Sequence, residues 1–311
     1  MVSQRIVILA ILVAASAVPA FDYAITRVGD DVRAGRLASF DTITAGTAPA
    51  PYRYRVLVPY AIAPLVALAD RVWPHADSLH RIDAVFVVTA LTALLWSVFL
   101  YLRNWYPPML ALIGALLVAA TMPIALRHHF YSPYSLLEPT FLILGLHAIY
   151  HGRARHVLIL AVLASLNRET GILIPIAHLF HEWRARTYGP RFVAAMAGVG
   201  LSVLTIVALR LSLGPAPESI TIESVRAINL SPDGLKAAAT NIPLFAGVTG
   251  WVLAAAGWRH APPFVRQQIW IAGFYLPIVA VFGVWYEVRL LMPLYPLLIP
   301  AIVAAVQRAA S

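Results

Sequence analysis

The chain of 311 residues contains no cysteine, so it forms no disulfide and offers no thiolate for catalysis or metal binding. Charge is scarce too: 12% of the residues are Asp, Glu, Lys or Arg, whereas soluble domains carry roughly a quarter. Lysine occurs only at Lys236, so nearly all positive charge comes from arginine. No basic run with interleaved aromatic residues suggests nucleic-acid binding.

Apolar side chains are abundant, at 60% of the residues. This composition predicts an all-α polytopic membrane protein, because helices satisfy their own backbone groups in lipid. The net charge of +9 then indicates arginine-rich cytoplasmic loops and anionic lipid headgroups as partners. The excess of arginine over lysine fits either codon bias or binding of lipid phosphates.

The apolar segments predict how the chain crosses the membrane. Residues 1–20 are either a signal peptide or, as we favour, a retained first helix, and both place residue 22 on the outer face. Segment 56–69 holds two prolines and is short for a span, so we expect it along the outer surface. We predict one transmembrane domain over 1–311, with a first helix at 1–21, an outer loop with juxtamembrane helices at 22–83, and further helices at 84–311. The later apolar segments lie at about 84–101, 109–125, 135–150, 157–181, 192–213, 241–257, 269–285 and 290–306.

Arginines in short loops predict the orientation. They place 151–156, 181–191, 257–268 and the C-terminal tail in the cytoplasm, so that 127–135, 214–240 and 285–289 face outward. The stretch "NRET" interrupts the apolar segment 157–181 and predicts a hairpin turn directed toward the outer half of the membrane. A charge at the bilayer centre costs ~3 kcal/mol unless it is paired or faces water. We therefore expect Glu169 to be either the orienting partner of Arg168 or a packing counter-ion.

The predicted outer face collects the polar residues that we take as candidates for a site. Solvated loop charges, an interfacial aromatic belt and helix-packing ion pairs are the structural alternatives. The candidates are Asp22, Asp30, Asp31, Arg53, Arg55, His128, His129, Tyr131, Glu138, Arg168, Glu169, Glu287 and Arg289.

This combination of residue types suits a lipid phosphate. Arginine binds phosphate through paired, charge-assisted hydrogen bonds and stabilises a leaving phosphate. A carboxylate near the acceptor hydroxyl takes its proton as general base. Together the residues favour transfer of a sugar from a polyprenyl-phosphate donor, with inversion at the sugar carbon.

Four features of the chain resemble the GT-C superfamily of integral-membrane glycosyltransferases. An acidic residue, Asp22 in "FDY", follows the first helix, and the first outer loop carries "PYRYRVLVP". A mid-chain "LNRETGILIP" and a late "YEVRLLMPLYPLLIP" complete the likeness, which is architectural and covers nearly the whole chain.

The resemblance implies a helical bundle in the bacterial inner membrane, with an active site facing the periplasm. It implies that Asp22 is the base, with Asp30 or Asp31 as the fallback, and that Arg168 and Arg289, then Arg53 or Arg55, contact the lipid phosphate. The acceptor would be an envelope glycan, a lipid or a protein. The acidic pair expected of metal-using members is matched only by Asp30 and Asp31. A divalent metal therefore stays open as a cofactor.

Two other classes of function stay open from the sequence. Broken helices and intramembrane ion pairs also occur in secondary transporters and lipid flippases. Many members of the superfamily carry a longer chain and a C-terminal soluble domain, which this sequence does not show. We therefore keep two further interpretations: that the protein works with a partner subunit, or that it is a non-catalytic scaffold in an envelope-polymer complex.

Overall fold

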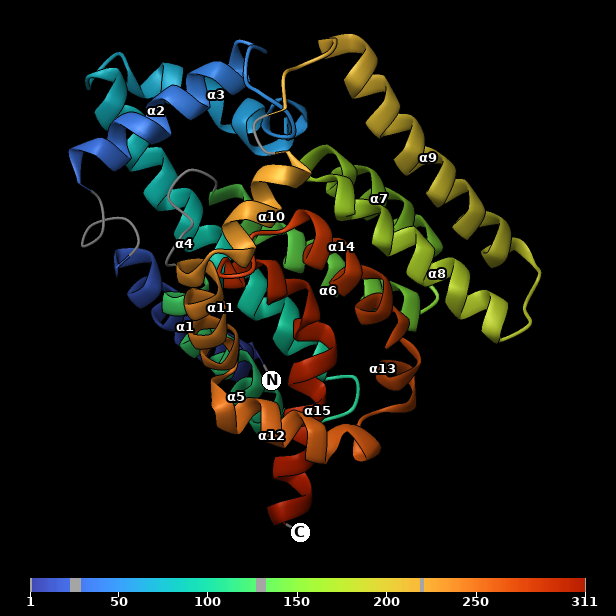
Figure 1. Cartoon of the computed structure of the whole chain (residues 1–311). Coiled ribbons are helices and arrows are strands. Elements are labelled where there is room, and N and C mark those ends of the chain that lie inside the picture. Colours follow the sequence, from blue (N-terminus) through green and yellow to red (C-terminus); the bar gives the residue numbers. More distant parts are fainter. Residues whose placement is uncertain (1, 23–28, 127–132, 219–220, 311) are drawn as a thin grey trace. The chain divides into compact units, whose positions relative to one another are not determined.

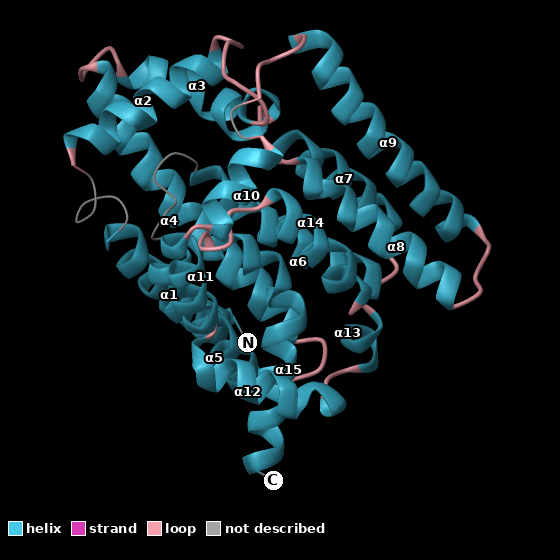
Figure 2. Ribbon diagram, in the orientation of Figure 1, coloured by secondary structure: helices cyan, strands magenta, loops and turns pink. Residues whose placement is uncertain are grey.

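The computed structural model describes residues 2–22, 29–126, 133–218 and 221–310 (Figure 1). These residues form helices joined by loops and turns (Figure 2), and an isolated parallel bridge joins Ala50 to Glu218. The prediction of an all-α protein is therefore confirmed for the described part of the chain.

Within the described residues, five helical segments are long and apolar enough to cross a membrane, which agrees with a multi-pass membrane protein. A bent pair of helices, Pro232–Phe245 and Gly247–His260, meets at 61° and would be a sixth. Shorter apolar helices occupy Leu57–Ala69, Leu137–Tyr150, Ala154–Asn167 and Trp270–Phe282. The five long segments are Gln4–Phe21, His75–Leu102, Pro108–Ala125, Pro190–Leu213 and Val288–Ala310.

The chain forms two compact units, and their boundary falls within the first and fourth helices. Unit 1 comprises Met1–Pro19, Thr92–His128 and Ile220–Ser311, and unit 2 comprises Ala20–Leu91 and His129–Ser219. Because the units are separate compact bodies, each is described by itself below.

The helices of unit 2 begin with the segments predicted as an outer loop. α4 (His75–Leu102) starts well before the predicted span at residue 84, and its first part belongs to this unit. The other elements are α2 (Asp30–Thr44), η2 (Tyr52–Tyr54), α3 (Leu57–Ala69), η3 (Pro133–Leu136), α6 (Leu137–Tyr150), α7 (Ala154–Asn167), η4 (Glu169–Ile172), α8 (Leu173–Arg184) and α9 (Pro190–Leu213).

An apolar cluster holds α2, α3 and the start of α4 together. It is built from Phe40, Val58, Ile62, Val66 and Leu79, all buried. Beside it, the ring of His75 contacts two carboxylates from different elements. Its Nδ1 lies 2.8 Å from Asp70 and its Nε2 lies 3.2 Å from Asp41. The predicted loop is thus a packed helical subassembly.

The "NRET" stretch forms a tight break between α7 and α8. Arg168 has extended backbone angles, φ −164° and ψ 147°, so α7 ends at Asn167 and the chain turns through η4. Gly171 lies so close to the end of α7 that an added Cβ would be 2.3 Å from the carbonyl carbon of Ala164. A glycine is therefore required for the turn to fold back on the helix.

The elements of unit 1 surround the C-terminal helix, α15 (Tyr295–Ala310), whose residues from Tyr295 to Ala304 are mostly buried. The others are α1 (Val2–Phe21), the second part of α4, α5 (Pro108–Ala125), α10 (Ile222–Leu230), α11 (Pro232–Phe245), α12 (Gly247–Gly257), η5 (Trp258–His260), α13 (Pro263–Gln267), α14 (Trp270–Phe282) and η6 (Val288–Leu294).

Close packing and polar contacts fix α15. The Tyr106 hydroxyl donates to the carbonyl of Pro300 over 2.8 Å, and the Tyr295 and Thr121 hydroxyls lie 2.6 Å apart. Gly257 of α12 is so near α15 that an added Cβ would lie 1.9 Å from the carbonyl oxygen of Ala301. The two helices therefore touch through backbone.

The structure differs from the prediction most clearly between residues 214 and 257. The predicted outer loop 214–240 contains α10 and the start of α11, and the apolar segment 241–257 is divided between α11 and α12. The division falls at Gly247, whose φ of +65° is a left-handed conformation that ends a helix.

Candidate functional site

A buried polar cluster lies at the turn between α7 and α8 in unit 2. The Arg168 guanidinium donates through Nη1 to Oε2 of Glu138, at the start of α6, and the Thr170 hydroxyl donates to Oε1 of the same carboxylate. The side chains of Arg168 and Glu138 are 11% and 6% exposed. The hairpin tip is thus fixed to α6 through a carboxylate with both oxygens bonded.

The pairing changes how the "NRET" residues are interpreted. Two neighbouring charges had suggested Glu169 as the partner of Arg168, whereas the structure pairs Arg168 with Glu138, 30 residues away. Oε1 of Glu169 is buried and makes no hydrogen bond to any described residue. A buried carboxylate oxygen without a donor is costly, so Glu169 offers an acceptor for a bound hydroxyl or amide.

Arg53 and Arg55 make structural contacts in unit 2, close to the end of α9. Arg53 donates from Nη1 to the carbonyl of Pro215 over 2.9 Å, and Arg55 lies over the ring of Tyr52 at 5.0 Å. Nε of both arginines is buried without a hydrogen bond among the described residues. Arg53 therefore combines a structural contact with an unused donor.

The three candidate aspartates lie around the start of unit 2. Asp22 follows the last residue of α1 and is half-buried, while Asp31 is exposed in the first turn of α2. Asp30 is the first residue of α2, and its side chain is not among those described. No group of three His, Asp or Glu side chains that could hold a metal ion occurs among the described residues.

In unit 1, Glu287 and Arg289 form a second ion pair. Nε and Nη2 of Arg289 donate to the same oxygen, Oε2 of Glu287, over 2.9 and 2.7 Å. The Arg289 side chain is 9% exposed and that of Glu287 is 22% exposed. The pair joins residues two apart in the chain, so it orients the guanidinium locally.

The loop that leads to this pair is held by two buried asparagines. Asn229 of α10 donates to the carbonyl of Gly283 over 2.8 Å and accepts from the Trp285 amide over 2.9 Å. Asn241 of α11 donates to the carbonyl of Tyr286 over 3.1 Å. Sequence reasoning missed both asparagines, because α10 and α11 carry other polar residues and the burial of these two depends on packing.

Three candidates, His128, His129 and Tyr131, fall outside the described residues. Five of the others lie in two groups, apart from the three aspartates, Arg53 and Arg55. Glu138, Arg168 and Glu169 come together in unit 2, and Glu287 and Arg289 come together in unit 1. Thr170, which the sequence did not single out, belongs to the first group.

Comparisons with known proteins add no family to this description. No protein-family model, no curated protein and no solved structure matches the chain. The described residues of the chain are folded into helices, and several of these helices are long and apolar enough to cross a membrane.

Proposed function

We propose that this protein is an integral-membrane glycosyltransferase that moves a sugar from a polyprenyl-phosphate donor to a hydroxyl acceptor. The observation that carries the proposal is the buried, unbonded carboxylate oxygen of Glu169 next to the Glu138–Arg168 pair. Binding of a polar substrate can offset the free-energy cost of keeping such a group in a membrane helix hairpin.

The oriented arginines support a phosphate as part of that substrate. Glu138 engages Nη1 of Arg168, and Glu287 engages Nε and Nη2 of Arg289. A guanidinium carries five N–H donors, so it can bridge a carboxylate and a phosphate oxygen. In unit 2, Glu138 holds Arg168 in place before a phosphate binds, and in unit 1 Glu287 does the same for Arg289. This lowers the free-energy cost of ordering each arginine.

The proposed reaction is an inverting displacement at the anomeric carbon. The bond from this carbon to the phosphate oxygen breaks, and its electron pair leaves on the polyprenyl phosphate. The acceptor oxygen forms the new bond from the opposite face while its proton passes to the carboxylate of Asp22. Arg168 stabilises the charge on the leaving phosphate, and Glu169 accepts a hydrogen bond from a sugar or acceptor hydroxyl.

Transfer from radiolabelled polyprenyl-phosphate sugars to membrane acceptors, measured with the purified full-length protein, tests the proposal. Asp22→Asn should lower kcat by about 10²- to 10⁴-fold, the usual contribution of a general base. Glu169→Gln should lower kcat/KM by about tenfold, since it removes one charged hydrogen-bond acceptor. Asp77→Asn and Glu223→Gln replace exposed acids elsewhere and should transfer at the wild-type rate.

Two results would contradict the proposal at different levels. Wild-type transfer by Asp22→Asn would remove the base assignment and keep the enzyme class. If the wild-type protein transfers no sugar from any donor and instead exchanges lipid across liposomes, the flippase interpretation of its buried ion pairs replaces the enzyme.

A further inference from the structure

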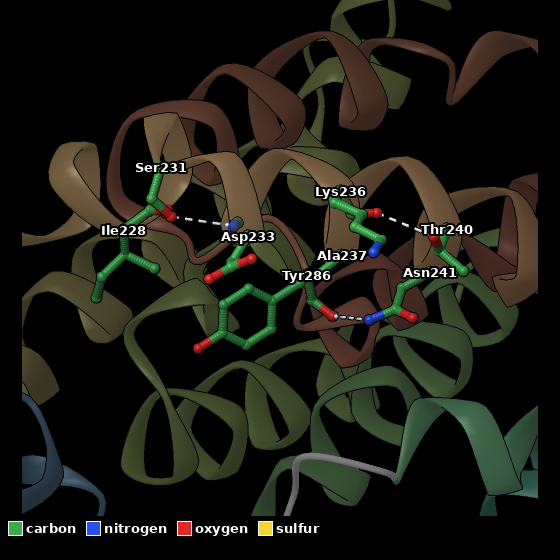
Figure 3. Close-up of a pocket in the computed structure, with 9 residues that line it drawn as sticks. Ile228, Ser231, Asp233, Lys236, Ala237, Thr240, Asn241 and Tyr286 are labelled. Atoms are coloured by element: carbon green, nitrogen blue, oxygen red, sulfur yellow. Dashed lines mark hydrogen bonds between the residues drawn. The ribbon is translucent and has the colours of Figure 1, made fainter.

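A pocket of about 500 Å³ opens beside α11 in unit 1, away from the Glu138–Arg168 cluster in the chain (Figure 3). Its volume is in the range of small-molecule sites. Its lining combines apolar surface with polar groups from Ser231, Asp233, Lys236, Thr240, Asn241 and Tyr286. The predicted outer loop 214–240, for which the sequence suggested no role, supplies most of these residues.

One wall of the pocket is fixed in advance. The loop that carries Tyr286 is held by the hydrogen bonds of Asn229 and Asn241, both buried. The other wall is the start of α11, where the Ser231 hydroxyl accepts from the amide of Gly234 over 3.0 Å and caps the helix. A pocket with such walls needs little reordering when a ligand enters.

Two opposite charges face the pocket without pairing. Asp233 and Lys236 are exposed, and neither side chain makes a hydrogen bond or an ion pair with any described residue. Their charges cancel, so the pocket has no excess positive charge for an isolated phosphate. What it offers instead is an acceptor-only carboxylate and a donor-only ammonium a turn apart.

Groups of these kinds match a ligand whose polar atoms both donate and accept. Asn241 uses its amide nitrogen on the Tyr286 carbonyl, and Thr240 donates its hydroxyl proton to the Lys236 carbonyl over 2.9 Å. The amide oxygen and the hydroxyl oxygen can then accept from a ligand. The half-buried ring of Tyr286 adds an apolar face among these polar groups.

From this arrangement we propose that the α11 pocket binds a sugar ring, with Asp233 and Lys236 bonded to its hydroxyls and Tyr286 against its apolar face. The choice of a sugar over other polyols rests on the proposed function. The α11 pocket is then a carbohydrate-binding site in unit 1. It shares no lining residue with the groups assigned above to the phosphate and the base.

Lys236 makes this proposal directly measurable, because it is the only lysine in the chain. Acetylation of the full-length protein in detergent, read by peptide mass spectrometry, reports on this one side chain apart from the amino terminus. Free mannose, glucose, galactose, arabinose and N-acetylglucosamine serve as probes. At least one should slow the modification about tenfold when present at ten times its Kd.

Variants and a second probe decide whether the protection comes from this pocket. Asp233→Asn and Tyr286→Ala should lose most of the protection, measured as the ratio of rates with and without sugar. Glu223→Gln removes an acid from the first turn of the neighbouring α10, outside the pocket, and should keep it. Protection by inorganic phosphate and by none of the sugars, or equal loss in Glu223→Gln, would overturn the proposal.

The assay contains no lipid donor, so its outcome is separable from that of the transfer assay. If sugars fail to protect Lys236 while Asp22-dependent transfer occurs, the pocket assignment alone is wrong. If sugars protect Lys236 while no transfer occurs from any donor, the pocket assignment stands and the proposed reaction fails.

Discussion

Each unit contains a glutamate–arginine ion pair, and the two pairs are built differently. Glu138 and Arg168 come from separate elements 30 residues apart, and Thr170 completes the bonding of the carboxylate. Glu287 and Arg289 are two residues apart, and the arginine engages one carboxylate oxygen. The first pair holds a hairpin to another helix, whereas the second only orients a side chain. Similar charges can therefore serve the fold in one unit and a local geometry in the other.

The largest difference between the pairs should appear on removing one carboxylate charge. Glu138→Gln leaves a guanidinium buried without its counter-charge, and it should cost about 3 kcal/mol of unfolding free energy. Glu287→Gln acts on a partly exposed, local pair and should cost about 1 kcal/mol. Unfolding of each detergent-purified variant, followed by circular dichroism, gives both values. Equal losses would mean that the distance between partners along the chain does not matter here.

A double-mutant cycle sharpens the same comparison. Removing both charges of the unit 2 pair, with Glu138→Gln and Arg168→Met, should recover about 2 kcal/mol relative to the sum of the single variants. The corresponding cycle for Glu287 and Arg289 should give a coupling of about 0.5 kcal/mol. A coupling near zero for Glu138 and Arg168 would contradict their role in holding the hairpin.

The turn that presents Arg168 can be tested through its glycine. Gly171→Ala forces a methyl group against the backbone of Ala164 and should cost about 2 kcal/mol, the range of overpacked sites. Gly200→Ala, inside α9, meets nothing within 4 Å and should stabilise the helix by about 0.5–1 kcal/mol. The shift in thermal midpoint of the two variants should thus have opposite signs.

The smallest effect is expected at the exposed Asp41–His75–Asp70 contact of unit 2. Hydrogen bonds from Ser78 and then His75 lower the pKa of Asp70 below its ordinary value. A lowered pKa in the folded state adds stability above the ordinary pKa of aspartate and loses it as the pH falls through the folded value. Asp70→Asn should therefore flatten the loss of stability below about pH 4.

Much of the helical framework could be predicted because it depends on local apolar runs. The long helices α5, α9 and α15 coincide with predicted segments, and the break at Arg168 was readable because charge interrupts an apolar stretch. The partner of Arg168 could not be read in this way. Its identity depends on how α6 packs beside the hairpin, which no local pattern encodes.

The pocket beside α11 was missed for a different reason. The arginine-based orientation assigned residues 214–240 to an outward-facing loop, whereas this segment contains two helix starts. Thr221 and Ser224 form a capping box, and Ser231 followed by Pro232 begins α11. These signals favour short helices as well as turns, and only the packing of α10 and α11 against the 283–287 loop decides between them.

The contact between Gly257 and the carbonyl of Ala301 has a consequence for how freely this sequence can vary. An added Cβ would lie 1.9 Å from that oxygen, so every side chain other than hydrogen meets backbone that cannot rotate away. In a saturation library selected for folded protein, residue 257 should return glycine alone, while the exposed Val203 and Leu204 of α9 accept any apolar residue. The most restrictive position of unit 1 is then one that carries no side chain.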